Sequence, residues 1–157
     1  MQYRMKHFQL TQEQIDELLQ RADTGRFGTI REDGYPYVIA MHFVYHNGNI
    51  YMHGLPKGQK IDNVNNNPKA CFEVDELLGL MTEGIEAACD TEAVYNSVVM
   101  TGTARILQDY EYKREVLNKL VEKYTPQFAG KELPQKMVQG TAVIELQVEE
   151  CTGKYHS

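Results

Sequence analysis

Apolar runs of strand length, separated by glycine-containing turns, fill the first third of the chain and constrain its fold more than any other feature. The run at 26–30 is followed by a turn at Asp33-Gly34, and the run at 37–46 then begins. A second turn, Asn-Gly-Asn at 47–49, leads into the run at 50–54. Asx-Gly pairs between apolar runs are a strong signal of β-hairpins, because these residues tolerate the positive φ angles of tight hairpin turns. We therefore expect an antiparallel meander of three consecutive strands.

Further along the chain, apolar periodicity predicts three more strands and three helices. Thr11 and Gln14 match a capping box at the start of the first helix, and Val116 and Leu120 lie on the apolar stripe of the last. Gly102 indicates a bulge or a close backbone approach within a strand. The expected strands are 69–76, 95–107 and 140–154, and the expected helices are 12–22, 60–68 and 109–125.

Residues 76–94 show neither helical nor strand periodicity, so we expect a long irregular loop there. The whole pattern predicts a mainly β (α+β) fold, a small barrel of about six antiparallel strands with flanking helices. No repeat or linker interrupts the chain, which we expect to form one domain over 1–157.

Charge and cysteine content exclude several classes of function. The 157 residues carry a formal net charge of −6, which argues against a general nucleic-acid or anionic-membrane surface. No apolar run is long enough to span a bilayer, and no signal peptide is evident. Three widely spaced cysteines form neither a disulfide framework nor a zinc motif. We expect a soluble cytoplasmic protein.

The turn after the run at 50–54 offers a place for an anion. Gly54 and Gly58 permit close backbone approach, Lys57 and Lys60 supply cationic donors, and a helix start follows. Phosphate is the natural ligand of that combination, although a solvated surface turn remains the alternative. The turn matches neither the Walker P-loop nor the dinucleotide GxGxxG pattern.

Three histidines lie on neighbouring predicted strands. His42 and His46 share the same strand parity and are expected to line one side, with His53 on the next strand. Carboxylates that would complete a metal site are not evident in the sequence, so we predict no metal here.

The stretch "GRFGTIREDGYPYVIAMHFVYHNGNIYMHGLPKGQKIDNVNNNPKACFEV" resembles the core of the pyridoxamine 5′-phosphate oxidase-like flavoproteins with an FMN-binding split barrel. It is most similar to their nitroimidazole-resistance (Nim-type) branch, as are "CDTEAVYNSVVMTGTARIL", the helix at 109–125 and the closing "CTGK". The resemblance covers nearly the whole chain and implies FMN in a groove at a homodimer interface.

Carried over by position, the resemblance assigns the FMN phosphate to Gly58, Gln59 and Lys60, with Lys60 as the phosphate-binding lysine. Met52 and His53 fall where strand residues touch the flavin or its phosphate. His53 also matches a histidine close to the cofactor in Nim-type proteins, so it is the candidate catalytic residue; a purely structural flavin contact is the alternative.

The same resemblance places backbone groups of the second predicted strand against the isoalloxazine ring. Ser97 matches a polar residue contributed from the dimer-related side. The strand residues assigned to the ring are Ile39, Ala40, Met41, His42 and Phe43.

Departures from the family pattern narrow the implied substrate. The oxidases carry arginine at the position of Ile39 and another basic residue at that of Gln59, and Ala40 replaces a proline often present in the Nim-type pattern. The closing segment 151–157 shows no substrate-binding arginine. These departures argue against pyridoxamine phosphate as substrate.

The implied function is an FMN-dependent oxidoreductase that reduces a small oxidised molecule, with nitroimidazole-type compounds among the candidates and NADH or NADPH as candidate donor. The alternative is a flavin- or haem-binding carrier or sensor without turnover, with His42 or His46 as a conceivable haem ligand.

Overall fold

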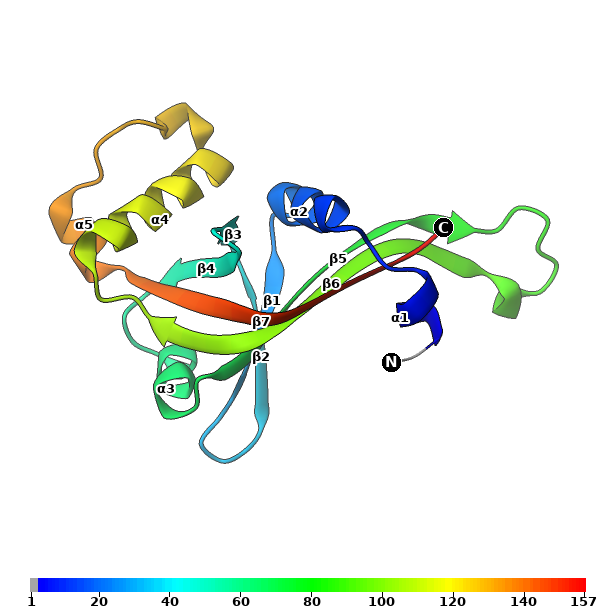
Figure 1. Ribbon diagram of the computed structural model, residues 1–157, viewed down its shortest axis with the longest axis horizontal. Coiled ribbons are helices and arrows are strands. Elements are labelled where there is room, and N and C mark those ends of the chain that lie inside the picture. The colour runs from blue at the N-terminus through cyan, green and yellow to red at the C-terminus, as the bar shows by residue number, and fades with distance from the viewer. Residues whose placement is uncertain (1–2) are drawn as a thin grey trace.

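The structure is a computed structural model that describes residues 3–157 as one curved sheet with helices packed around it (Figure 1). The strands are β1 (Gly25–Ile30), β2 (Pro36–Met41), β3 (Phe43–His46), β4 (Asn49–Gly54), β5 (Lys69–Met81), β6 (Glu92–Ile106) and β7 (Ala142–His156). The helices are α1 (Tyr3–His7), α2 (Gln12–Arg21), α3 (Gln59–Asn66), α4 (Tyr110–Tyr124) and α5 (Gln135–Gly140), with short 3-10 turns η1 (Ala88–Asp90) and η2 (Pro126–Phe128).

The sheet is an antiparallel barrel that is split at one residue. Its strand order is β2-β1-β5-β6-β7-β4-β3, so β2 and β3 are the two edges although only His42 separates them in the chain. Two trans peptide units span at most about 7 Å, so the sheet has to curl until its edges approach each other at His42. Within residues 3–157 no ladder joins these edges, and the barrel stays open there. The expected mainly β split barrel with flanking helices is confirmed.

The predicted three-stranded meander, in contrast, is wrong. The single strand expected at 37–46 breaks at His42 into β2, which pairs with β1, and β3, which pairs with β4. Apolar residues continue on both sides of His42, so the sequence pattern gives no sign of the break. The same break accounts for seven strands where about six were expected.

Helix α2 closes one end of the barrel and begins at the predicted capping box. The amide of Gln14 donates to Thr11 Oγ1 at 3.2 Å, and the amide of Thr11 donates to Gln14 Oε1 at 2.8 Å. Leu18 and Leu19 are fully buried in the core. Burial of each such side chain contributes about 1.5–3 kcal/mol, so packing holds this ten-residue helix in place.

Strands β5 and β6 form a long hairpin that projects from the barrel, with the C-terminal end of β7 beside it (Figure 1). The irregular loop expected at 76–94 is therefore wrong for most of its length, since only residues 82–91 lie outside the two strands. Leu77, Leu78 and Leu80 are 60–64 % exposed. Because apolar side chains on this arm stay exposed, its sequence lacks the apolar–polar alternation by which strands are predicted.

Gly102 occupies a bulge in β6, as the sequence indicated. The register between β6 and β7 shifts between Thr101 and Gly102. A Cβ at Gly102 would lie 1.9 Å from the carbonyl oxygen of Gln147, so only glycine fits this close backbone approach.

Helix α4, also predicted, covers the outer face of β3, β4 and β7. Asp109 caps it by accepting a hydrogen bond from the amide of Tyr112 at 2.7 Å. Val116 and Leu120 pack there against Val44 and other buried residues in a second, smaller core. None of the helices among residues 3–157 is long and apolar enough to cross a membrane.

Candidate functional site

The turn between β4 and α3 opens toward solvent at Gly58. This residue has φ = 124° and is the N-cap of α3. Residues other than glycine rarely adopt such a φ angle, so this backbone conformation favours glycine. No atom lies within 4 Å of the place where a Cβ of Gly58 would sit, which leaves room for a ligand against the backbone.

Three backbone amides at this turn are available. In the described part of the chain the amides of Gly58, Gln59 and Lys60 donate no hydrogen bond, whereas those of Ile61 and Asp62 donate to the carbonyl oxygen of Gly58. No side chain caps α3. Free amides at the start of an eight-residue helix carry partial positive charge and favour an anion.

Lys60 adds a full positive charge beside these amides. Its side chain is half-buried and lies along the end of β4, where a Cβ at Gly54 would be 3.2 Å from Lys60 Nζ. Gly54 therefore makes space for the lysine stem. Lys60 forms no ion pair or hydrogen bond within residues 3–157, so its three donors can serve a ligand.

Helix α3 is anchored so that the turn is held in place. Ile61 and Val64 are buried, as predicted. The Gln59 side chain donates to Asn63 Oδ1 at 2.7 Å, and the fully buried Asn63 donates to Thr29 Oγ1 of β1 at 2.9 Å. Because its side chain is engaged within the helix, Gln59 offers a ligand its backbone amide.

His53 is an exposed residue near the end of β4, just before the turn. Its side chain keeps an exposed edge, but burial of the remainder lowers its pKa below the ordinary 6.5, and the electrostatic influence of the nearby His42 and Lys60 lowers it further. The imidazole is therefore neutral at pH 7, with one nitrogen as donor and the other as acceptor.

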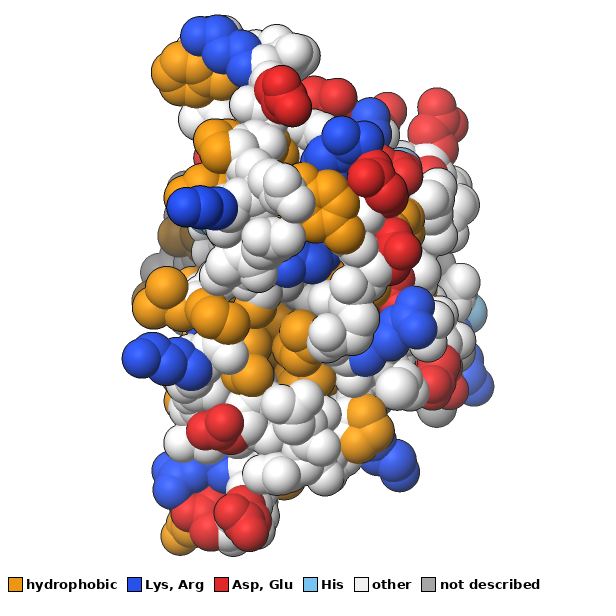
Figure 2. Space-filling model, turned by 90° about the vertical axis from the view of Figure 1, so that its left-hand side faces the viewer, with side chains coloured by type: hydrophobic (Ala, Val, Ile, Leu, Met, Phe, Trp, Pro, Cys, Tyr) orange, Lys and Arg blue, Asp and Glu red, His pale blue; other side chains and the backbone are white. Residues whose placement is uncertain are grey.

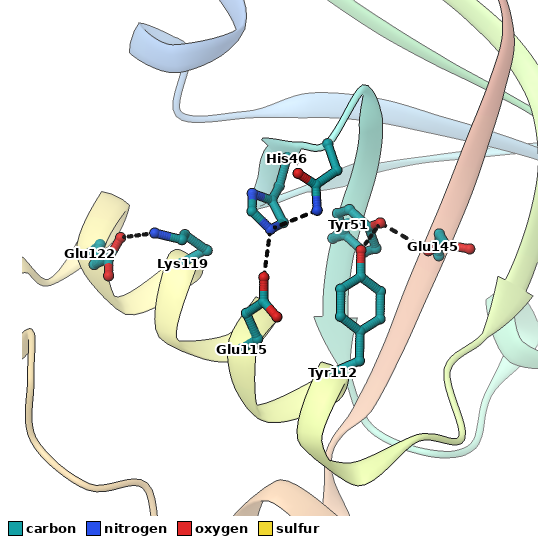
Figure 3. Close-up of polar contacts among 8 residues, drawn as sticks. His46, Tyr51, Tyr112, Glu115, Lys119, Glu122 and Glu145 are labelled. Carbon is teal, nitrogen blue, oxygen red and sulfur yellow. Dashed lines mark hydrogen bonds and ion pairs between the residues drawn. The ribbon is translucent and has the colours of Figure 1, made fainter.

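His42 and His46 point to the same side, as their parity predicted, and both contact α4. The His42 ring stacks on Tyr124, with centroids 4.5 Å apart and an interplanar angle of 19°. His46 Nε2 lies 2.9 Å from a carboxylate oxygen of Glu115 (Figure 3). No group of three potential metal-binding side chains occurs among the described residues, and no metal site is assigned.

A buried polar cluster behind this face escaped the sequence analysis. Tyr51 and Glu145 are almost fully buried, and Tyr51 Oη donates to Glu145 Oε2 at 2.9 Å (Figure 3). Tyr112 Oη lies 2.5 Å from Tyr51 Oη, and Arg105 Nε donates to Glu145 Oε1 at 2.6 Å. Burial raises the pKa of Tyr51, so the hydroxyl stays protonated as a donor. A glutamate inside the apolar run 142–146 was the available sequence signal.

Of the strand residues assigned to the flavin ring, some face inward. Phe43 and Met52 are fully buried, so only their backbones could meet a ligand on the surface. Ile39 and Met41 pack against the larger core but remain partly exposed. Ala40 is exposed on β2, which within residues 3–157 pairs with β1 alone, so that the other edge of β2 joins no strand of this part of the chain.

Ser97 lies far from the turn within one chain. It sits on β6 opposite Asp75 and Lys154, and it borders a cavity of about 530 Å³ beside the N-terminal residues 9–15. The α3 end of β6 is marked by Ala104, whose amide donates to the carbonyl of Pro68. Seven residues of strand separate Ser97 from Ala104, roughly 23 Å. A single chain does not bring Ser97 to the turn.

Comparison with known proteins gives one family and a consistent set of folds. The sequence pattern of the family described as pyridoxamine 5′-phosphate oxidase matches residues 11–155. The comparison with curated proteins gives no match.

Similar solved structures include three with informative descriptions. A candidate 5-nitroimidazole antibiotic resistance protein from Bacteroides thetaiotaomicron has a TM-score of 0.78 at 25% identity, over 92% of this chain and 84% of that one. The flavocytochrome Anf3 from Azotobacter vinelandii has a TM-score of 0.81 at 23% identity, over 94% and 68%. An FAD- and haem-binding protein from Mycobacterium smegmatis has a TM-score of 0.84 at 18% identity, over 94% and 72%.

Proposed function

The chain belongs to the pyridoxamine 5′-phosphate oxidase family, and on that premise we propose that it binds FMN and acts as a flavin-dependent oxidoreductase. The observation that carries the proposal is the turn at Gly58–Lys60, where backbone amides and the Lys60 side chain have no partner among residues 3–157 and open space faces Gly58. Three proteins of similar fold are described as binding FAD, which has the same isoalloxazine ring as FMN.

The residues at the turn fit a phosphate group, whichever flavin ring system the phosphate is attached to. An anion in front of Gly58 would accept hydrogen bonds from the backbone amides of Gln59 and Lys60 and from the Lys60 ammonium group. The single phosphate of FMN, at the end of a flexible ribityl chain, matches one such cradle. We therefore favour FMN over FAD.

A bound flavin supplies the redox chemistry, since it takes up two electrons and a proton from a donor such as NADH or NADPH and passes them to an oxidised acceptor. The protein's part is positional. Residues 39–43 form β2 and the His42 corner, where backbone N–H groups other than that of Phe43, which donates to Tyr124 Oη, would hydrogen-bond the polar edge of the ring. His53, neutral and beside the turn, is placed to hold or donate a proton.

We propose that the substrate is a small oxidised molecule other than pyridoxamine phosphate. Ile39 and Gln59 replace basic residues of the oxidases, and the segment 151–157 contains no arginine. Nitroimidazole-type compounds are candidate acceptors because one similar structure is described as a candidate resistance protein for them. The cytoplasm, where nicotinamide donors are available, is the proposed location.

The site is completed by a second copy in this proposal. Val38, Ala40, Val99 and Ser97 share the outer face of the β2-β1-β5-β6 part of the sheet, and Val38 and Val99 are 62 % and 41 % exposed. In a two-fold dimer formed through this face, Ser97 of the partner subunit can meet β2 near Ala40.

A carrier or sensor that binds flavin or haem without turnover is the second candidate, favoured by the two haem-containing structures of similar fold. In the described residues His46 is engaged with Glu115 and His42 is stacked on Tyr124, which weakens either as a haem ligand. A Soret band in the purified protein would support haem. Bleaching of bound flavin by NADH followed by reoxidation with a nitroaromatic would support the enzyme.

Lys60→Ala tests the proposed function directly. Loss of a charged hydrogen bond should weaken FMN binding by about 1.5–3 kcal/mol, measured by titrating apoprotein into FMN and following flavin fluorescence. Lys57→Ala is the matched control, because Lys57 is an exposed lysine of the same turn and should matter less. Equal FMN affinity in Lys60→Ala and the unmodified protein would remove Lys60 from the site.

A further inference from the structure

A mostly apolar cavity of about 500 Å³ lies between α4, α5 and the strand ends that carry His42 and His53. Leu117 and Val121 of α4 and Met137 of α5 contribute to its walls. Figure 2 views the molecule from the side of these helices, where hydrophobic side chains gather near the middle of the face. Its volume falls in the range of small-molecule sites, about 300–1,000 Å³.

At the polar end of this cavity, His42 is held in position by contacts with the protein. Tyr124, on which His42 stacks, accepts a hydrogen bond at Oη from the amide of Phe43 at 2.8 Å. His42 is thus held by a residue that is itself fixed to the barrel. His53 stands beside it as a neutral imidazole that can donate one hydrogen bond.

The apolar walls and the two histidines together favour a flat, uncharged ligand with a hydrogen-bond acceptor. Aliphatic walls disfavour a charged ligand, because it would lose its hydration without gaining an ion pair. A flat, uncharged ring fills such a slot with little loss of conformational entropy, and an oxygen on that ring can accept a hydrogen bond from an imidazole.

We propose that this cavity binds the electron acceptor, and that the acceptor is an uncharged aromatic or quinone-like molecule whose oxygen faces His42 and His53. The inference rests on the proposed function, since it assigns the substrate of the same site. His53 lies next to both Lys60 and the cavity, so the acceptor pocket begins where the phosphate turn ends.

The experiment uses nitrobenzene and toluene as probes, two flat molecules of which only nitrobenzene carries acceptor oxygens. Binding is followed by NMR, through the shifts of the histidine ring protons, with and without FMN. Nitrobenzene should bind about three- to tenfold more tightly than toluene, the ratio expected for one hydrogen bond. His53→Phe should keep toluene binding and reduce that preference.

Val121→Trp fills the cavity and should abolish binding of both probes. Phe128→Trp is the matched control, since Phe128 is exposed on η2 and does not line the cavity. Met137→Glu places a charge on the cavity wall and should likewise abolish binding of both probes. Because Met137 is exposed, this change should leave the stability of the fold intact.

FMN affinity, measured in the same samples, separates the two proposals. Probe binding without FMN binding would overturn the proposed function and leave the pocket. FMN binding with no probe binding up to the solubility limit, or with binding unchanged in Val121→Trp and Met137→Glu, would overturn the pocket alone.

Discussion

Two lysines of this chain show how surroundings decide what a residue does. Lys123 Nζ donates to the carbonyl of Leu19 at 3.0 Å and lies 3.9 Å from the centre of the Phe43 ring. Burial lowers the pKa of Lys123 to about 8. Lys60 has the same functional group but no partner among the described residues. Lys123 therefore joins α4 to the barrel, whereas Lys60 keeps its donors free of other described residues, as the proposed phosphate site requires.

His53 makes a residue-level prediction about pH. Its folded-state pKa lies below the ordinary 6.5, so below about pH 6.5 the unfolded chain binds more protons than the folded protein. The free energy of unfolding therefore decreases as the pH is lowered, until the pH is below the folded-state pKa. His53→Gln should show a smaller loss of unfolding free energy between pH 7 and 5, measured by urea denaturation at a series of pH values. Identical pH profiles for the two proteins would contradict the assignment.

Tyr51→Phe should destabilise the protein by about 1–3 kcal/mol, because buried Glu145 loses a hydrogen-bond donor that water cannot replace. Urea denaturation followed by circular dichroism measures the change. Tyr112→Phe is the control, since Tyr112 is only half-buried and its loss should cost less. An unchanged free energy of unfolding in Tyr51→Phe would mean that the hydrogen bond to Glu145 does not stabilise the protein.

Local and non-local contacts divide the residues that could be predicted from those that could not. Gly58 and Lys60 lie in one turn, so their spacing alone was enough to suggest an anion site, with a solvated surface turn as the alternative. Tyr51, Glu145 and Arg105 come from three strands, and their meeting depends on a register that no single stretch encodes.

At the scale of elements, the helices were predictable because their signals are local. The capping box at Thr11 and the stripe of α4 each lie within one helix. The break of the expected strand at His42, and the continuation of β5 and β6 into the expected loop, depend instead on contacts between segments that are distant in the sequence. The arm 76–94 has exposed leucines on its surface, so it carries no alternation to detect.

Gly102→Ala should destabilise the β6–β7 pairing by about 1–3 kcal/mol or more, because its methyl group would meet the backbone of Gln147. Thermal unfolding followed by circular dichroism gives the comparison. Gly79→Ala is the matched control on β5, where a Cβ meets nothing within 4 Å. Equal melting temperatures for the two variants would show that the bulge tolerates a side chain.

At the scale of the whole molecule, the single chain leaves surfaces that a partner would explain. The outer sheet face around Val38 and Val99 and the leucines of the projecting arm are exposed apolar surface. Ser97 lies on that outer face, roughly 23 Å of strand away from the end of β6 that contacts α3. A homodimer would cover the face and bring the partner's Ser97 to the flavin groove, an arrangement that the sequence indicated only through resemblance.

The most direct measurement is a crystal structure of the protein grown with FMN. The account predicts phosphate oxygens within hydrogen-bond distance of the backbone amides of Gln59 and Lys60 and of Lys60 Nζ. A structure in which FMN is bound but its phosphate lies elsewhere, with the turn at Gly58 facing solvent, would contradict it.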